Sequence, residues 1–368
     1  MISDLKTPAF LVDLPILQRN IGEMAKRAQR LGVRLRPHVK THKTAEIARL
    51  QAPGPDAAIT VSTLAEARFY KDKGFQDITY ACPLDPNKIP EAAQLGRDMR
   101  NFNLLLDHPD TFAALESYGR GNKIRFAVFL KVDCGYHRAG VDPEKSESYL
   151  LAEQIHNSRY VEFRGILTHA GHSYHCRGAE AIAAVARQER EIMAGFAEGL
   201  KKRGIEPIVV SVGSTPTAVH ARSWEGVSEI RPGNYVFFDK FMADIGACAF
   251  EDCAATVLVS VVGHYPERNQ ILVDGGALAF SKDPGAVHVD PEAGFGAVTG
   301  HPDLRFKSIS QELGVITSAS RMPFESFPIG GRMRIVPNHS CLAAALFPVY
   351  HVVEGSRVVD AWVPHRGW

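Results

Sequence analysis

A basic segment near the amino terminus holds the first residues suited to chemistry. Residues 36–43 read Arg-Pro-His-Val-Lys-Thr-His-Lys and follow a short apolar run. Lys40 is expected just past the carboxyl end of an early β-strand, where barrel enzymes build their active sites. Burial near other cations lowers the pKa of an amine and makes it a nucleophile, and the neighbouring Arg36, His38 and His42 could supply those surroundings. Lys40 is therefore a candidate for binding a carbonyl compound as a Schiff base, with Lys43 as its competitor.

A second candidate site lies near the other end of the chain, in Asn338-His339-Ser340-Cys341. Alternate residues of a strand face the same side, and imidazole and thiolate are good zinc ligands. The ordinary alternative is a buried cysteine beside a packed histidine. Two protein ligands would leave a metal open to substrate, as in a catalytic site. Together with Lys40, the pair suggests pyridoxal phosphate (PLP) and a divalent metal in one active site, with zinc preferred over manganese or magnesium.

Two loops have the composition of phosphate sites. Gly213-Ser214-Thr215-Pro216-Thr217 and Arg231-Pro232-Gly233-Asn234 would follow the seventh and eighth strands of a barrel. Barrels often bind phosphate with these two loops, and glycine and small hydroxyl residues expose backbone N–H groups to an anion. Either loop alone is a common turn sequence, so it is their joint position that favours phosphate.

Two further segments are expected at the same end of the barrel. Arg138, in the segment 131–140, could donate hydrogen bonds to a phenolate or carboxylate, or it could pair with Asp133 and stiffen the loop. The residues alone leave both interpretations open. Residues 169–176 read His-Ala-Gly-His-Ser-Tyr-His-Cys. We interpret this cluster as a source of acid–base and cofactor contacts rather than a second metal site.

The elements that must position these residues alternate between strand and helix. Eight aliphatic or β-branched runs are typical of parallel strands buried on both faces. With helical patterns between them, they predict a (β/α)8 barrel of the TIM type rather than an open doubly wound sheet. The predicted strands are 33–36, 58–62, 78–81, 103–106, 124–132, 161–168, 208–212 and 227–230. The predicted helices are 14–31, 64–73, 87–95, 109–117, 144–156 and 179–203.

After residue 239 the pattern changes to short β-rich runs separated by glycine and proline, which predicts a mainly antiparallel β domain. We expect the barrel at residues 14–245 and the β domain at residues 246–368. An opening strand at 9–13 could join the barrel, but we assign residues 1–13 to the β domain. The predicted strands of this domain are 256–263, 270–273, 314–317, 332–335 and 350–353.

Composition limits the possible partners. The 368 residues include 42 Lys and Arg against 41 Asp and Glu, so no strong field favours nucleic acid or an anionic membrane. No apolar run is long enough to span a bilayer, and the start lacks the apolar core of a signal peptide. Six scattered cysteines fit reduced thiols and a cytoplasmic setting.

As a set, these residues resemble the fold-type III PLP enzymes, whose founding pattern is the alanine racemase barrel. The segment 131–140 is similar to the racemase segment with an arginine near the cofactor phenolate, and 231–233 to the one with an arginine at the pyridine nitrogen. The closer resemblance covers nearly the whole chain. It is to the metal-dependent D-serine dehydratase, D-threo-3-hydroxyaspartate dehydratase and D-threonine aldolase group. The segments that carry it are 36–43, 61–67, 213–216, 337–341 and 363–368.

The resemblance implies roles for single residues and a homodimer. Lys40 would form the Schiff base and act in catalysis with His172, while His339 and Cys341 would bind the metal. The residues expected to contact PLP are Lys40, Arg138, Thr168, Tyr174, Ser214, Thr215, Arg231, Gly233 and Asn234.

The metal motif favours one reaction within the group. Dehydratases typically have His-x-Cys, as here, and aldolases His-x-Asp, so we expect a D-3-hydroxyamino acid to be converted to a 2-oxo acid and ammonia. His172 stands where the aldolases have a histidine base, so cleavage to glycine and an aldehyde is the alternative. A racemase would need a second base such as Tyr265 or Tyr350, and neither lies in a clear motif. A non-catalytic PLP carrier would be a single barrel without the β domain.

Overall fold

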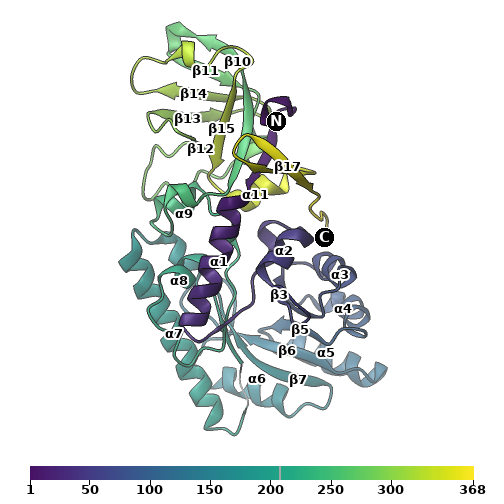
Figure 1. The fold of residues 1–368 in the computed structure, drawn as a ribbon. Helices are drawn as coiled ribbons and strands as arrows, with labels where there is room; N and C mark the ends of the chain where they lie inside the picture. Colours follow the sequence, from purple (N-terminus) through teal and green to yellow (C-terminus); the bar gives the residue numbers. More distant parts are fainter. Residues whose placement is uncertain (207–208) are drawn as a thin grey trace. The chain divides into compact units, whose positions relative to one another are not determined.

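The computed structural model describes residues 1–206 and 209–368. The chain forms two compact units (Figure 1). The barrel unit contains residues 24–233 and 367–368, and the β unit contains residues 1–23 and 234–366. The predicted domain bounds, 14–245 for the barrel and 246–368 with 1–13 for the β domain, stay predictions.

The barrel unit is built on eight parallel strands, as predicted. They pair in the order β2-β9-β8-β7-β6-β5-β4-β3. An isolated parallel bridge joins His38, beyond β2, to Thr60 of β3, so the two edges of the sheet meet and the barrel closes. The predicted strand 208–212 begins at a residue outside the described ones, and β8 starts at Val209. The strands are β2 (Arg34–Leu35), β3 (Ala58–Val61), β4 (Asp77–Pro83), β5 (Asn101–Leu106), β6 (Phe126–Lys131), β7 (Val161–Leu167), β8 (Val209–Val212) and β9 (Glu229–Ile230).

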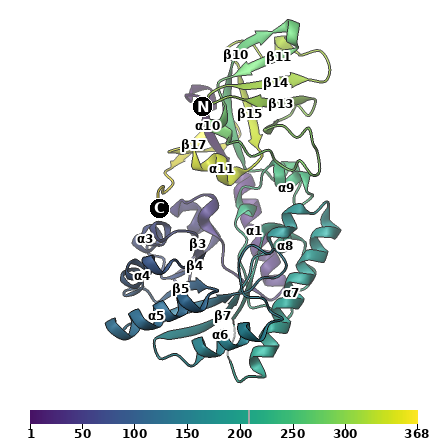
Figure 2. The ribbon, with the colours of Figure 1, turned by 180° about the vertical axis from the view of Figure 1, so that it is seen from behind.

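Helices cover the outside of these strands (Figure 2). Their starts are locally encoded: Thr63, for example, accepts a hydrogen bond from the backbone N–H of Glu66 at 3.0 Å, which caps α3. The sequence prediction missed two short helices, α2 and α8. The helices are α1 (Leu14–Arg30), α2 (Ala45–Gln51), α3 (Leu64–Asp72), α4 (Ile89–Gly96), α5 (Pro109–Asn122), α6 (Ser146–His156), α7 (Ala179–Lys201) and α8 (Thr215–His220).

The β unit is a nine-stranded sheet in the order β11-β14-β13-β12-β15-β10-β1-β16-β17. A further pairing of β11 with β10 closes six of these strands into a barrel. All pairs are antiparallel except β1 with β16, where Phe10 lies opposite Tyr350 and their ring centroids are 4.9 Å apart. The opening strand therefore joins the β unit. Its strands are β1 (Ala9–Asp13), β10 (Ala255–Tyr265), β11 (Gln270–Val273), β12 (Gly296–Val298), β13 (Leu304–Ile309), β14 (Gly314–Ser318), β15 (Arg332–Pro337), β16 (Tyr350–Glu354) and β17 (Arg357–Trp362).

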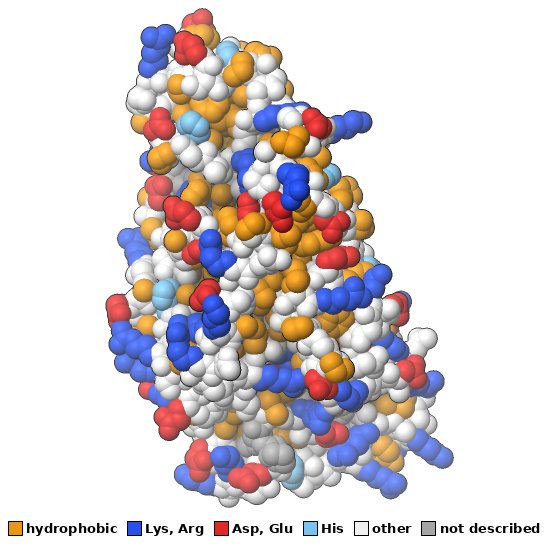
Figure 3. All heavy atoms as spheres, viewed as in Figure 1, with side chains coloured by type: hydrophobic (Ala, Val, Ile, Leu, Met, Phe, Trp, Pro, Cys, Tyr) orange, Lys and Arg blue, Asp and Glu red, His pale blue; other side chains and the backbone are white. Residues whose placement is uncertain are grey.

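Short helices connect the strands of the β unit: α9 (Lys240–Asp244), α10 (Ala277–Phe280) and α11 (Ser340–Ala345). On the face of the molecule shown in Figure 3, basic and acidic side chains are interspersed. This agrees with the near-zero net charge of the sequence. Among the described residues, no helix is both long and apolar enough to cross a membrane.

Candidate active site

Lys40 lies where the sequence predicted it, on a 3₁₀ turn (Val39–Thr41) that follows β2. Its side chain is exposed, and its amine makes no hydrogen bond or ion pair with any residue that the structure describes. The competing Lys43 differs, because its amine pairs at 2.9 Å with the buried carboxylate of Glu66. That ion pair engages the Lys43 amine, so of these two lysines Lys40 has the available amine.

The predicted surroundings of Lys40 are wrong in one respect. The positive charge of Arg36 is balanced by ion pairs with Asp77 at 2.6 Å and Glu229 at 2.9 Å. Burial lowers the pKa of His42 to about 3, so that ring is uncharged. Burial also holds the pKa of His38 well below its usual range, with smaller contributions from nearby cations. The positive charge near Lys40 comes instead from residues on other strands.

Three cations from the carboxyl ends of other strands share the end of the barrel that carries Lys40. Arg231 follows β9, Lys131 ends β6 and Arg138 lies in the loop after β6. The amine of Lys131 is buried and makes no hydrogen bond or ion pair with any described residue. Burial, followed by the charges of Arg231 and Arg138, lowers the pKa of Lys131 to about 8. The sequence analysis missed Lys131, although its place at a strand end was a usable signal.

Arg138 is not paired with Asp133, so the interpretation that this pair stiffens the loop is wrong, and the contact to a phenolate or carboxylate stays a prediction. Asp133 instead contacts Nδ1 of His137 at 2.9 Å and accepts the backbone N–H of Gly135 at 3.0 Å. The Arg138 guanidinium lies over the ring of Tyr136, 5.1 Å from its centroid. The N–H groups of the Arg138 guanidinium are therefore available to another acceptor.

Arg231 is held by a buried polar network. Its guanidinium donates to Oγ of Ser211 at 2.5 Å and to the carbonyl oxygen of Thr168. Ser211 donates in turn to Glu229 at 2.6 Å, and Glu229 pairs with Arg36. Burial lowers the pKa of Arg231 to about 10, which still leaves the guanidinium charged at neutral pH. Ser211 and Glu229 are supporting residues that the sequence analysis missed.

The loop after β8 has the predicted position, but part of its backbone is already engaged. The buried carboxylate of Glu189, on α7, accepts the N–H of Gly213 at 3.0 Å, and burial raises the pKa of that carboxyl. Ser214 caps α8 by accepting the N–H of Thr217 at 3.2 Å. The predicted ligands Ser214 and Thr215 are both buried beside this turn.

Glycine is required at position 233, in the loop after β9. A Cβ there would lie 2.8 Å from the backbone oxygen of His38. The loop after β9 is thereby packed against the segment that carries Lys40. The next predicted PLP ligand, Asn234, belongs to the β unit.

The histidine cluster forms a 3₁₀ turn (Gly171–His175) after β7. Nδ1 of His169 contacts the backbone oxygen of Gly213 at 2.6 Å. Neither ring nitrogen of His172 makes a hydrogen bond of ordinary geometry, although the amide of Gln188 lies nearby. Burial lowers the pKa of His172, so its ring is neutral at neutral pH and could accept a proton.

Two other predicted residues lie at this turn. The hydroxyl of Thr168 donates to the backbone oxygen of Val132 at 2.7 Å, so it is already engaged. The ring of Tyr174 lies 6.1 Å from that of His169, centroid to centroid. Their roles in PLP binding stay predictions.

His339 and Cys341 do not lie on a strand, and this expectation was wrong. β15 ends at Pro337, His339 directly precedes α11, and Cys341 is in the first turn of that helix. The cause is a distant contact: buried Asp239 accepts the backbone N–H of Ser340 at 2.9 Å and its hydroxyl at 3.1 Å, which starts the helix. Although they lie at the start of a helix, the side chains of His339 and Cys341 form a hydrogen bond with each other.

The structure adds Asp283 to this pair. Oδ2 of Asp283 lies 2.9 Å from Nδ1 of His339. Burial disfavours the charged imidazole, but hydrogen bonds with Asp283 and Cys341 outweigh it and raise the pKa of His339 to about 11. Among the described residues, no three His, Cys, Asp or Glu side chains converge in a metal-binding arrangement. A metal here would have two protein ligands and open positions, as the sequence analysis expected.

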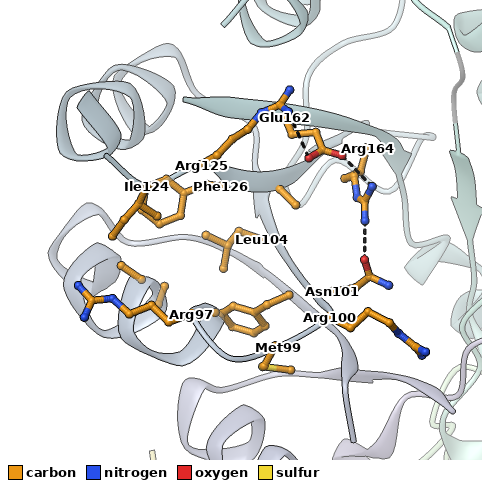
Figure 4. A pocket seen from close by; sticks show the side chains of 15 residues that line it. Arg97, Met99, Arg100, Asn101, Leu104, Ile124, Arg125, Phe126, Glu162 and Arg164 are labelled. Carbon is orange, nitrogen blue, oxygen red and sulfur yellow. Dashed lines mark hydrogen bonds and ion pairs between the residues drawn. The ribbon is translucent and has the colours of Figure 1, made fainter. Parts of the chain in front are cut away.

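A crevice of about 330 Å³ lies at the opposite ends of the barrel strands, where β5, β6 and β7 begin. Figure 4 shows Arg97, Arg100 and Arg125 around an apolar floor that includes Leu104. None of the predicted site residues lines this crevice. Because barrel active sites lie at the carboxyl ends of the strands, we do not assign it to the reaction.

Comparison with known proteins agrees with the division of the chain into a barrel and a β unit. Residues 12–240 match the family described as alanine racemase, N-terminal domain, and residues 254–353 match a family of serine dehydratase domains. The D-serine dehydratase of Dictyostelium discoideum is 40% identical over 100% of this chain and 98% of its own length. The chain belongs to the D-serine dehydratase group of alanine racemase-like enzymes. The predicted resemblance is thereby confirmed.

Other members of the group are dehydratases and aldolases. The D-threo-3-hydroxyaspartate dehydratase of Delftia sp. HT23 is 38% identical, and its solved structure matches with a TM-score of 0.95 over 100% of this chain and 99% of that chain. A solved cysteine-to-alanine mutant of that enzyme is described as a metal-free form. A D-threonine aldolase of an Arthrobacter species is 28% identical over 100% of this chain and 94% of its own length. Both reaction types are lyase reactions, so the predicted enzyme class is confirmed.

Proposed function

We propose that the chain is a PLP- and metal-dependent dehydratase that converts D-serine or D-threo-3-hydroxyaspartate to a 2-oxo acid and ammonia. The observation that carries the proposal is the His339-Ser340-Cys341 site in a chain that is 38–40% identical to two dehydratases over almost their full lengths. The side-chain chemistry of both units supports it.

The barrel unit fits an anionic carbonyl cofactor. Lys40 and Lys131 have amines without a described partner, and Arg138 and Arg231 lie at the same end of the strands. PLP carries a phosphate and a phenolate, and when bound it serves as the electron sink for negative charge at the substrate Cα. Lys40 would hold it covalently, and Arg138 would donate to its phenolate.

The remaining predicted ligands would complete the cofactor site. Arg231, kept charged by its network, would face the pyridine ring. The other residues that we propose around PLP, mostly at its phosphate, are Thr168, Tyr174, Ser214, Thr215, Gly233 and Asn234.

Lys40, the metal ligands and His172 would carry out the proton transfers and the loss of hydroxide. The free amine of Lys40 would remove the proton from the substrate Cα. His339 and Cys341 would hold a divalent ion, zinc by preference, whose Lewis acidity makes hydroxide a tolerable leaving group. Because a base at the β-oxygen would oppose loss of hydroxide, His172 would position the substrate or act as a general acid.

Aldol cleavage is the second candidate, and His172 is the observation that favours it. Its neutral ring could take the proton of the β-hydroxyl, after which Cα–Cβ cleavage would give glycine and an aldehyde. In that case His172→Asn should slow glycine release from D-threonine by roughly 10²–10⁴-fold. A racemase or a non-catalytic PLP carrier has no observation here in its favour.

The direct test of the proposal is ammonia and pyruvate release from D-serine by the protein loaded with PLP and zinc, with L-serine as the stereochemical control. Ammonia and pyruvate are expected from D-serine and not from L-serine. We also propose a cytoplasmic homodimer. None of the six cysteines, all of which the structure describes, forms a disulfide, which supports a reducing compartment. Light scattering of the eluted protein tests the dimer.

A further inference from the structure

Asp283, in the loop after α10, has no role in the mechanism above, yet it contacts the proposed metal ligand directly. We propose that Asp283 is a positioning residue that fixes the tautomer and orientation of His339, so that Nε2 of the imidazole binds the metal. This inference rests on the proposed metal site and goes beyond the two ligands that the sequence predicted.

The contact determines which nitrogen is available. Oδ2 of Asp283 and Nδ1 of His339 are 2.9 Å apart. A carboxylate only accepts hydrogen bonds, so Nδ1 must carry the proton of this bond. A neutral imidazole has one lone pair, which then belongs to Nε2. Asp283 thereby keeps the proton on Nδ1, so a metal ion would displace the proton of Nε2 and bind there.

Asp283 is itself held in place. Its Oδ1 accepts the backbone N–H of Gly285 at 2.9 Å, and its backbone oxygen accepts from the side-chain amide of Asn338 at 3.0 Å. The same amide donates to the backbone oxygen of Gly294 at 2.8 Å. Asn338 directly precedes His339, so these bonds fix the carboxylate relative to the backbone of the ligand.

Gly285 makes this arrangement sterically possible. Its φ is +74°, and a Cβ there would lie 2.8 Å from the side-chain nitrogen of Asn338. Because both oxygens of Asp283 are engaged, by Gly285 and by His339, Asp283 fits the role of an orienting group and not of a third ligand.

Zinc titration of the purified full-length protein tests the proposal. Asp283→Ala should weaken zinc binding by about 10–100-fold, the usual effect of losing a carboxylate behind a histidine ligand. Asp283→Asn should weaken it less, because the amide oxygen can still accept from Nδ1. Asp290→Ala is the matched control: this carboxylate pairs with Arg305 at 3.7 Å and accepts the backbone N–H of Glu292 at 2.9 Å, so its variant should bind zinc as the wild type does.

Two further measurements separate the outcomes. Thermal unfolding of the metal-free variants shows whether they fold. ¹⁵N NMR of the histidine ring in the zinc-loaded protein reports which nitrogen binds the metal, with Nε2 expected in the wild type and a mixture of Nε2 and Nδ1 in Asp283→Ala. Unchanged affinity in a folded Asp283→Ala, or zinc bound by Nε2 alone in that variant, would overturn the inference. If wild type and His339→Ala bind zinc equally, it is the proposed metal site that fails.

Discussion

The hydroxyl of Ser211 donates a 2.6 Å hydrogen bond to Oε1 of Glu229 in the core of the barrel unit. The other oxygen of Glu229 accepts from Arg36, and Ser211 accepts from Arg231. One carboxylate thus links two buried guanidiniums: Arg36, which follows the neighbouring strand β2, directly, and Arg231, which follows its own strand β9, through Ser211 of β8. It fixes Arg231 at the end of the barrel where PLP is proposed to bind.

Glu229→Gln should therefore destabilise the cofactor-free protein by about 3 kcal/mol, because it leaves buried positive charge without its partner. Urea unfolding measures the change. Glu225→Gln is the control: Glu225 is 88% exposed, and its variant should lie within about 0.5 kcal/mol of the wild type. Equal stabilities for the two variants would show that the network does not hold the core.

Lys40→Ala should abolish the imine absorbance of bound PLP, because Lys40 is the amine assigned to the Schiff base. Lys43→Ala should retain the absorbance, since the Lys43 ammonium is engaged by Glu66. Borohydride trapping followed by peptide mapping identifies the modified lysine. A trapped adduct in Lys40→Ala that is absent in Lys43→Ala would reverse the assignment.

The lowered pKa of Lys131 should make the stability of the folded protein depend on pH. Its pKa is about 8 in the folded chain against 10.5 ordinarily, so below pH 8 the folded protein bears the cost of burying a charge. Between these values the unfolded chain holds more protons, and stability rises with pH. Cofactor-free Lys131→Met should exceed the wild type by up to about 3 kcal/mol at pH 7, with a smaller gap at pH 10. A gap that does not change with pH would contradict the assignment.

Chelation should remove activity while PLP stays bound, because the metal is assigned to the substrate hydroxyl and not to the cofactor. Absorbance of bound PLP and ammonia release, measured on the same sample, test this. Cys341→Asp should shift the metal preference toward harder ions, since it replaces a thiolate with an oxygen ligand. Full activity in metal-free protein would remove the metal from the mechanism.

The fold was predictable because parallel strands covered on both faces are continuous apolar runs. The elements that were missed are short. α2 has seven residues and α8 six, too few for a helical period to show, and in β13 the alternation of buried and exposed residues ends at Lys307, which exposed Ser308 follows. The ends of the barrel strands could be located from the sequence. Their positions also located Lys40, Arg138 and the two loops at 213–217 and 231–234.

The supporting residues could not be predicted, because contacts between distant segments place them. Asp283 meets His339 across 56 positions and Asp239 meets Ser340 across 101, and neither has a local signal. The second contact also explains why His339 and Cys341 begin a helix, since the cap on Ser340 ends the strand periodicity assumed for the motif.

The most direct test of the dehydratase assignment is the identity of the products formed from D-serine and D-threonine by the protein loaded with PLP and zinc. The assignment predicts pyruvate from D-serine and 2-oxobutanoate from D-threonine, each with one equivalent of ammonia. Stoichiometric glycine and acetaldehyde from D-threonine, with no oxo acid from D-serine or D-threo-3-hydroxyaspartate, would contradict it.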